Sequence, residues 1–210
     1  MSIARTRIAV LFATKEGQTR KIGDYVAARL RDSGAEVDVE DVAHLPEGYS
    51  LAGYAGALLA ASIHMGKHEG AMVKFVKHHH AELASIPTAF LSFSLSEAGV
   101  ERPGTPPEQR KSSEGDVRKI MDAFFAETGW SPTRQRPVAG ALRYSQYGFV
   151  MRFVMRRIAK KTGGGTDTSR DYEYTDWAAL GQFVDDFGLE LLGPPKPSDG
   201  RPRAAHVWPV

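Results

Sequence analysis

A short polar segment near the N-terminus combines residue types that bind an anion. It consists of Thr14, Lys15, Glu16, Gly17, Gln18 and Thr19. An apolar run over residues 8–12 precedes it, and a helical pattern over residues 19–30 follows. The N–H groups of such a turn and the positive end of the helix dipole converge on one anion, and threonine hydroxyls donate to phosphate oxygens. The segment therefore predicts a phosphate site. It is neither G-x-G-x-x-G nor a P-loop, which counts against a dinucleotide or a triphosphate.

Basic residues concentrate in a second region, residues 129–165, which holds eight of them and no acidic residue. Six are candidates for contacts to a substrate or a membrane: Arg143, Arg152, Arg156, Arg157, Lys160 and Lys161. Helical spacing over residues 147–161 predicts two faces. The apolar face holds Val150, Met151, Val154, Met155 and Ile158, and the opposite face holds Arg152, Arg156 and Lys160. Such a helix binds carboxylates or lies on an anionic membrane, unless it packs on the domain with a solvated basic face. Because Val and Met rather than stacking aromatics separate the arginines, we expect no nucleic acid partner.

Composition limits the remaining chemistry. The length of 210 residues fits one domain over residues 1–192, followed by a proline-rich stretch over 193–210 that we expect to be a mobile tail. The absence of cysteine excludes thiol catalysis and cysteine-ligated iron–sulfur and zinc sites. Three consecutive histidines at residues 78–80 point in different directions on a helix, so we expect a surface helix end and no metal site. No apolar run could span a bilayer and no secretory signal is visible, so we expect a cytoplasmic protein, or one peripheral on the inner face of the cell membrane.

Apolar runs alternate with helical patterns along the chain. Strands are predicted over residues 8–13, 37–39, 57–61, 88–94 and 136–142, and helices over 21–32, 70–83, 116–128 and 176–192. This alternation predicts a doubly wound α/β fold, in which a parallel sheet is covered by helices on both faces. Ligands bind such sheets at the carboxyl ends of the strands, where the polar segment lies. Residues 143–170 interrupt the alternation and form an insertion that is too long for a plain connection.

An ordered set of motifs resembles a known family. The motifs are T-K-E-G-Q-T-R (residues 14–20), A-S-I-H-M-G-K-H (61–68), F-V-K-H (75–78), A-G-A-L-R-Y (139–144), T-G-G-G-T-D-T (162–168) and Y-T-D-W (174–177). The set is similar to the bacterial flavodoxin-type protoporphyrinogen oxidases. The resemblance implies a flavodoxin-like five-stranded parallel sheet of order 2-1-3-4-5, with the basic insertion after or within the fifth strand. It also implies that FMN takes electrons from protoporphyrinogen IX and passes them to a membrane quinone, menaquinone or ubiquinone, in haem biosynthesis.

The resemblance also assigns residues to the flavin. The polar segment would hold the FMN phosphate, with Glu16 turned away because a carboxylate repels it. Two loops, over residues 62–68 and 92–96, would frame the isoalloxazine. Their candidates are Ser62, Ile63, His64, Met65, Gly66, Ser92, Phe93, Ser94 and Leu95. Phe93 and Leu95 could instead be core residues. His64 and His68 are weak candidates for proton transfer, since imidazole titrates near neutral pH; no definite catalytic base is named.

Other functions remain open from the sequence. One is a flavodoxin-like quinone reductase with a different donor. Another is a non-catalytic electron carrier, although the basic insertion and the lack of a Trp or Tyr in the two predicted flavin loops count against it. A third is a regulatory domain that has lost its cofactor.

Overall fold

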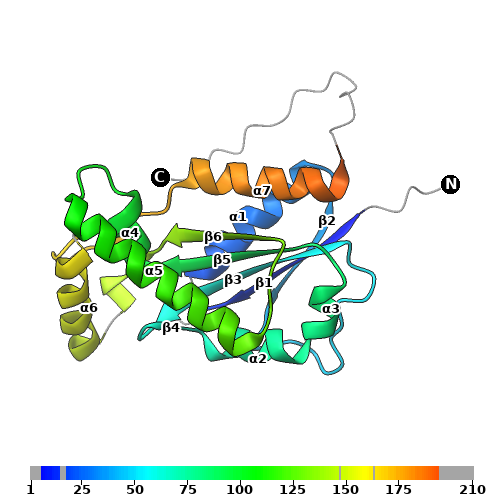
Figure 1. Cartoon of the computed structure of the whole chain (residues 1–210), viewed down its shortest axis with the longest axis horizontal. Helices are drawn as coiled ribbons and strands as arrows, with labels where there is room; N and C mark the ends of the chain where they lie inside the picture. The colour runs from blue at the N-terminus through cyan, green and yellow to red at the C-terminus, as the bar shows by residue number, and fades with distance from the viewer. Residues whose placement is uncertain (1–5, 15–17, 147, 163, 194–210) are drawn as a thin grey trace, which may run out of the picture.

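The computed structural model of the chain describes residues 6–14, 18–146, 148–162 and 164–193 (Figure 1). Lys15, Glu16 and Gly17 of the predicted phosphate segment lie outside the described residues, and so does the tail predicted over residues 193–210 beyond Gly193. The side chains of Gln18 and Lys161 are likewise outside the description, as are those of four residues of the predicted apolar face, Val150, Met151, Val154 and Ile158.

Five parallel strands form the central sheet in the order β2-β1-β3-β5-β6. Their bounds are β1 Arg7–Ala13, β2 Glu36–Asp41, β3 Gly56–His64, β5 Thr88–Ser94 and β6 Arg134–Ala139. This is the predicted order 2-1-3-4-5, because β4 (Lys67–His68) only pairs antiparallel with the end of β3. The three inner strands are apolar almost throughout and buried on both sides, as parallel strands must be when helices cover both faces.

Helices cover both faces of the sheet, and Figure 1 shows α7 above it and α2 and α3 below it. On one face, α1 (Gln18–Asp32) and α7 (Trp177–Leu192) pack through Ile22, Val26, Leu180 and Phe187. On the other face lie α2 (Gly70–His78), α3 (His80–Ala84) and α5 (Pro107–Thr128), which bury Met72, Phe75, Leu83, Met121 and Phe124. Each face therefore has its own apolar core.

Several predicted elements have different bounds in the structure. The helix predicted over 70–83 is broken at His79, whose buried ring donates from Nδ1–H to the Glu82 carboxylate, 2.8 Å away. The sequence predicts a surface helix end at the three histidines. His78 and His80 are exposed, whereas His79 is buried. The helix predicted from residue 116 begins earlier, at Pro107, because proline is favoured in the first turn. The strand predicted over 136–142 ends at Ala139, because the chain leaves the sheet at Gly140.

The insertion is a small folded unit between β6 and α7. It comprises β7 (Ala141–Leu142), a 3₁₀ turn (Tyr144–Gln146), α6 (Phe149–Thr162) and β8 (Tyr172–Glu173). Strands β7 and β8 pair antiparallel at its base. Its own core consists of Leu142, Tyr144 and Ala159, with Leu95, Met155, Tyr172 and Tyr174 packed against them.

The glycine-rich segment closes this insertion against tyrosine side chains. The Tyr144 hydroxyl donates to the Gly165 carbonyl (2.9 Å), and the Gly165 N–H donates to the Tyr174 hydroxyl (2.6 Å). A Cβ atom on Gly165 would lie 2.2 Å from two ring atoms of Tyr172. Only glycine therefore fits at this position.

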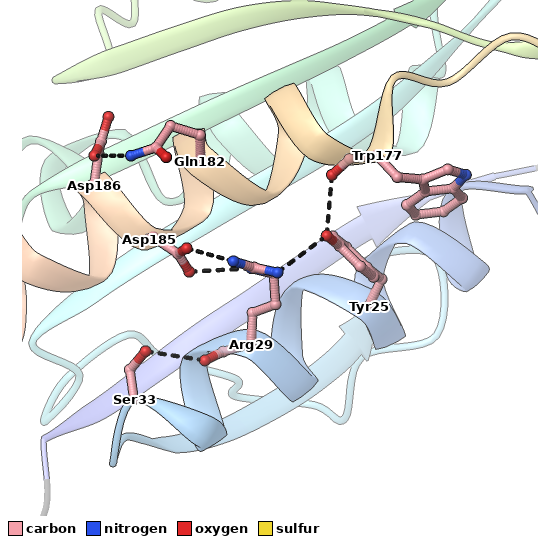
Figure 2. A network of polar contacts seen from close by, with 7 residues as sticks. All are labelled: Tyr25, Arg29, Ser33, Trp177, Gln182, Asp185 and Asp186. Carbon is pink, nitrogen blue, oxygen red and sulfur yellow. Dashed lines mark hydrogen bonds and ion pairs between the residues drawn. The ribbon is translucent and has the colours of Figure 1, made fainter. Parts of the chain in front are cut away.

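Helices α1 and α7 are tied together by a polar network (Figure 2). Arg29 forms a two-pronged ion pair with Asp185, and its third nitrogen lies 3.4 Å from the Tyr25 hydroxyl. That hydroxyl donates to the backbone carbonyl of Trp177 (3.0 Å). A Cβ atom on Gly181 would lie 2.8 Å from the same hydroxyl, so the two helices approach closely here.

We predict that Gly165→Ala disorders the insertion while the sheet stays folded, because the added methyl group displaces the Tyr172 ring. Overpacking of this kind costs about 1–3 kcal/mol. Limited trypsin digestion is the measurement, since α6 contains several lysines and arginines. The matched control is Gly148→Ala, which lies in the same insertion with open space around its Cβ position. Equal resistance of the two variants to trypsin would contradict the prediction.

Candidate functional site

The strand register gathers the predicted site residues at the carboxyl edge of the sheet. Ala13 at the end of β1 pairs with Ala61 in β3, and Ala61 pairs with Ser92 in β5. Ser94 at the end of β5 pairs with Ala139 at the end of β6. The polar segment, the chain after β3, the start of α4 (Leu95–Glu101) and the insertion therefore leave the sheet along one edge. The switch point between β1 and β3, where ligands of such sheets bind, lies on this edge.

Thr19 has the environment expected of a side chain that binds an anion. It lies in the first turn of α1, directly after the polar segment, and is 1% exposed. Its hydroxyl is buried and has no hydrogen-bond partner among the described residues. Burying a hydroxyl unpaired costs about 1–3 kcal/mol. A phosphate oxygen at the helix N-terminus would accept this hydrogen bond, so the residues present fit a bound phosphate. Thr14, half-buried at the end of β1, stands on the other side of the segment.

The loop predicted over residues 62–68 is instead a β-hairpin. Ser62, Ile63 and His64 continue β3, and β4 returns antiparallel after a two-residue turn. Both turn residues, Met65 (φ 51°) and Gly66 (φ 78°), have left-handed backbones, which matches the twist of a two-residue hairpin. Met65 is 89% exposed at its tip. The hairpin thus presents its turn, and the half-buried end of β3, beside the switch point.

The loop predicted over residues 92–96 does not exist, because α4 begins directly after β5. The Ser94 hydroxyl accepts a hydrogen bond from the Glu97 N–H (3.0 Å) and so caps the helix. Phe93 is buried in the core beneath α1 and α7, and Leu95 packs on the insertion core. Phe93 is therefore a core residue, whereas Leu95 is only partly buried. The S-x-x-E spacing of Ser94 and Glu97 is a helix-start signal that would have revealed this.

His68 lies in the core rather than at an exposed loop. Its ring packs against both Phe90 and Phe124, which stack on each other, with ring centroids 5.3 and 4.6 Å away, and its Nε2 contacts the Ser92 hydroxyl at 2.8 Å. Burial lowers the pKa of His68 to about 4. A buried imidazole that stays neutral near pH 7 is a poor proton carrier. His64, half-exposed in the hairpin, is the more accessible of the two candidates.

A buried carboxyl group that the sequence did not indicate lies close to this edge. Glu97, in the first turn of α4, is 8% exposed. Burial raises its pKa to about 7; Glu101 and Glu114 act in the same direction, and Arg136 opposes them. Arg136 lies 3.6 Å from the Glu101 carboxylate. Glu97 therefore holds a proton at neutral pH more readily than an ordinary glutamate.

The outer face of α6 carries an open pocket of about 690 Å³. It is lined by Phe153, Arg156, Arg157, Lys160 and Thr166. Three cations beside one aromatic ring suit a ligand that is apolar and carries anionic groups. Phe153, which is 60% exposed, and Thr166 were not among the predicted residues. The sequence could have indicated Phe153, because it lies four residues before Arg157 and so on the same side of a helix.

The other two described cations of the predicted set are less accessible. Arg152 is half-buried, with its Nε atom shielded from solvent, so it does not share the open face of Arg156 and Lys160. Arg143 is half-buried directly after β7. Met155 and Ala159 face the insertion core, as predicted for Met155. The helix thus packs on the domain with one side and presents cations on the other.

Comparison with known proteins identifies the relatives of this chain. The flavodoxin domain family matches residues 9–169. The protoporphyrinogen IX dehydrogenase (quinone) of Escherichia coli strain K12 is 37% identical over 175 residues, which cover 83% of this chain and 91% of that protein. The protein of the same name from Leishmania major is 36% identical over 201 residues, covering 94% of this chain and 81% of its relative. The chain belongs to this flavodoxin-type family.

The family assignment confirms the resemblance inferred from the motifs. Among solved structures, oxidised flavodoxin 1 of Bacillus cereus aligns with a TM-score of 0.45 and 18% identity, over 86% of this chain and 96% of that one. Within the described residues, no helix is both long and apolar enough to cross a membrane.

We predict that Glu97→Gln stabilises the protein increasingly as the pH rises. The folded-state pKa of about 7 lies above the unfolded value of about 4.3. The wild type therefore loses stability as Glu97 ionises across that interval, whereas glutamine loses none. The gain should be near zero at pH 4 and reach on the order of 1–3 kcal/mol above pH 7.

Urea unfolding of wild type and variant between pH 4 and 8 is the measurement. Exposed Glu47→Gln is the control for loss of one negative charge. His68 acts with the opposite sign, since its lowered pKa makes stability fall as the pH drops from about 6.5 to about 4. Both proteins contain His68, so its contribution cancels in the difference between the free energies of unfolding of Glu97→Gln and the wild type. A difference that does not change with pH would refute the prediction.

Proposed function

We propose that this protein is an FMN-dependent dehydrogenase that oxidises protoporphyrinogen IX to protoporphyrin IX and reduces a membrane quinone. The observation that carries the proposal is the open basic pocket on α6, in an insertion attached to the carboxyl edge of a flavodoxin-family sheet. The names of the relatives in E. coli and L. major give the substrate and the acceptor. Six electrons leave the porphyrinogen in three two-electron oxidations, so three quinones are reduced per porphyrin.

FMN suits the edge that holds the candidate residues. Thr14 and Thr19 would hold its phosphate together with backbone N–H groups of the polar segment, and the unpaired Thr19 hydroxyl supports this assignment. The hairpin from Ser62 to Gly66 and the first turn of α4 would flank its ring system. When bound, FMN supplies the two-electron redox chemistry that none of the protein side chains can provide.

The α6 pocket suits the porphyrinogen better than it suits an electron-transfer protein. Protoporphyrinogen IX has an apolar macrocycle and two propionates. Arg156, Arg157 and Lys160 would bind the propionates, and the exposed Phe153 ring would contact the macrocycle. A volume of about 690 Å³ is in the range of small-molecule sites.

The same surface favours contact with an anionic membrane, where a hydrophobic quinone is dissolved. Clusters of cations on one side of a helix attract anionic lipids at about 1 kcal/mol per residue. We therefore propose that the protein acts at the inner face of the cell membrane, with menaquinone or ubiquinone as acceptor. The exposed Phe153 side chain lies among these cations, which supports contact of this surface with the membrane.

The deciding experiment adds protoporphyrinogen IX anaerobically to FMN-loaded protein with a quinone analogue and follows porphyrin fluorescence. We expect FMN-dependent formation of protoporphyrin well above the rate of the same mixture without protein. If FMN stays bound and no protoporphyrin forms, the proposal is wrong. The protein would then be a quinone reductase with another donor or an electron carrier.

We predict that Thr19→Val weakens FMN binding by about tenfold or more, because a charge-assisted hydrogen bond to phosphate is lost. The same change should not lower the stability of the apoprotein, since it removes a buried hydroxyl that has no partner. Flavin fluorescence titration measures the first effect and thermal unfolding of apoprotein the second. If the variant binds FMN with unchanged affinity, Thr19 does not bind the phosphate.

We predict that charge reversal at Arg156 and Arg157 raises the KM for protoporphyrinogen at least tenfold while FMN content is unchanged. Both side chains are exposed and line the pocket, so reversal removes attraction without disturbing the core. Binding of the variant to vesicles with and without anionic lipid separates the two proposed roles. Unchanged KM and unchanged vesicle binding would leave α6 as a packed helix with a solvated basic face.

A further inference from the structure

A single carboxylate joins the base of the insertion to the helix that starts at the phosphate segment. Glu173, in β8, accepts hydrogen bonds from the Lys21 ammonium (3.0 Å) and from the Trp177 indole N–H (2.8 Å). Lys21 lies two residues after Thr19 in α1, and Trp177 is the first residue of α7. The three residues thus connect α1, the insertion and α7 at one point.

The contacts around this point leave little freedom for the three elements. The Lys21 ammonium also lies 5.0 Å from the centroid of the Trp177 ring, and that ring packs edge-on against Tyr25 of α1 at 4.8 Å. The backbone of Glu173 pairs with Ala141 in β7, at the other end of the insertion. Glu173 therefore links both ends of the insertion to α1, through its backbone pairing with Ala141 and its carboxylate contact with Lys21.

The remaining supports of the insertion act at different places. Tyr144, Gly165 and Tyr174 hold it together internally, and Leu95 of α4 packs against its core. One ion pair joins a side chain of the insertion to α1, that of Glu173 with Lys21. This ion pair therefore restrains the orientation of α6 relative to α1, in addition to the packing on α4.

We propose that Glu173 is a positioning residue, which sets the orientation of the basic insertion relative to the cofactor-binding helix α1. The proposal rests on the proposed function, because it assigns the cofactor to the N-terminus of α1 and the porphyrinogen to α6. Without the ion pair, the pocket would sample several positions relative to the bound cofactor. Substrate binding would then weaken, whereas the reaction of correctly bound substrate would not.

The first test measures the position of the insertion and needs neither substrate nor turnover. The chain has no cysteine, so spin labels can be placed at cysteines that replace exposed Asp32 in α1 and exposed Lys160 in α6. We expect Glu173→Gln to broaden the distribution of distances between the labels. This variant keeps an acceptor for the Trp177 indole and loses only the charge, so it should fold. Lys21→Met should give the same broadening, and the double variant no more than either alone.

The matched control is Glu127→Gln, which removes a similarly exposed ion pair, Lys77 with Glu127, between α2 and α5. It should leave the distances unchanged. A distribution in Glu173→Gln as narrow as that of the wild type would overturn the proposal.

The second test uses the FMN-loaded enzyme. Glu173→Gln should raise the KM for protoporphyrinogen about two- to fivefold, in line with the small energies of exposed ion pairs, with unchanged kcat and FMN affinity. A raised KM without broadened distances would assign Glu173 to substrate binding and overturn its positioning role. Broadened distances in a protein that does not oxidise porphyrinogen would instead refute the proposed function and leave the positioning role intact.

Discussion

The parallel register of β1, β3, β5 and β6 is the constraint on which the rest of the molecule depends. Because parallel strands run in one direction, each of them must end at the same edge, and each exit from the sheet meets its neighbours there. The four exits differ: a polar segment follows β1, a hairpin follows β3, a capped helix follows β5 and a folded insertion follows β6. The candidate site residues gather at this edge, whereas apolar cores occupy both faces of the sheet.

Charge is distributed unequally over this edge. The carboxyl groups of Glu97 and Glu101 are largely buried next to Arg136, and burial raises the pKa of both. The cations of α6 lie on the outside, with Phe153 among them. The edge therefore presents positive charge to its surroundings, although the chain as a whole carries a formal net charge of only +2. This local excess is what distinguishes the surface from the rest of the domain.

The sequence predicted the sheet well because its inner strands are continuous apolar runs, a pattern that only a doubly covered parallel sheet requires. Thr14 and Thr19 flank a glycine-bearing turn between strand and helix, and the phosphate site that this pattern indicates stays a prediction. The sequence failed where tertiary pairing decides the outcome. Residues 137–142 form one run without a charged residue, and only the pairing of Ala141 with Glu173 shows that the strand ends at Ala139. The burial of His68 against a stacked pair of phenylalanines likewise depends on residues distant in the chain.

The two ends of the insertion lie next to each other, which has a consequence for how the chain folds. The Tyr174 N–H donates to the Gly140 carbonyl (3.2 Å), and the Thr175 hydroxyl donates to the Ala139 carbonyl (2.9 Å). Residues on both sides of the insertion are thus held as if a short turn joined β6 to α7. The insertion can open and close as a cooperative unit of its own while the sheet stays intact, since its opening does not separate β6 from α7. Its amide hydrogens would then exchange with solvent through local opening, on a faster timescale than those of the inner strands.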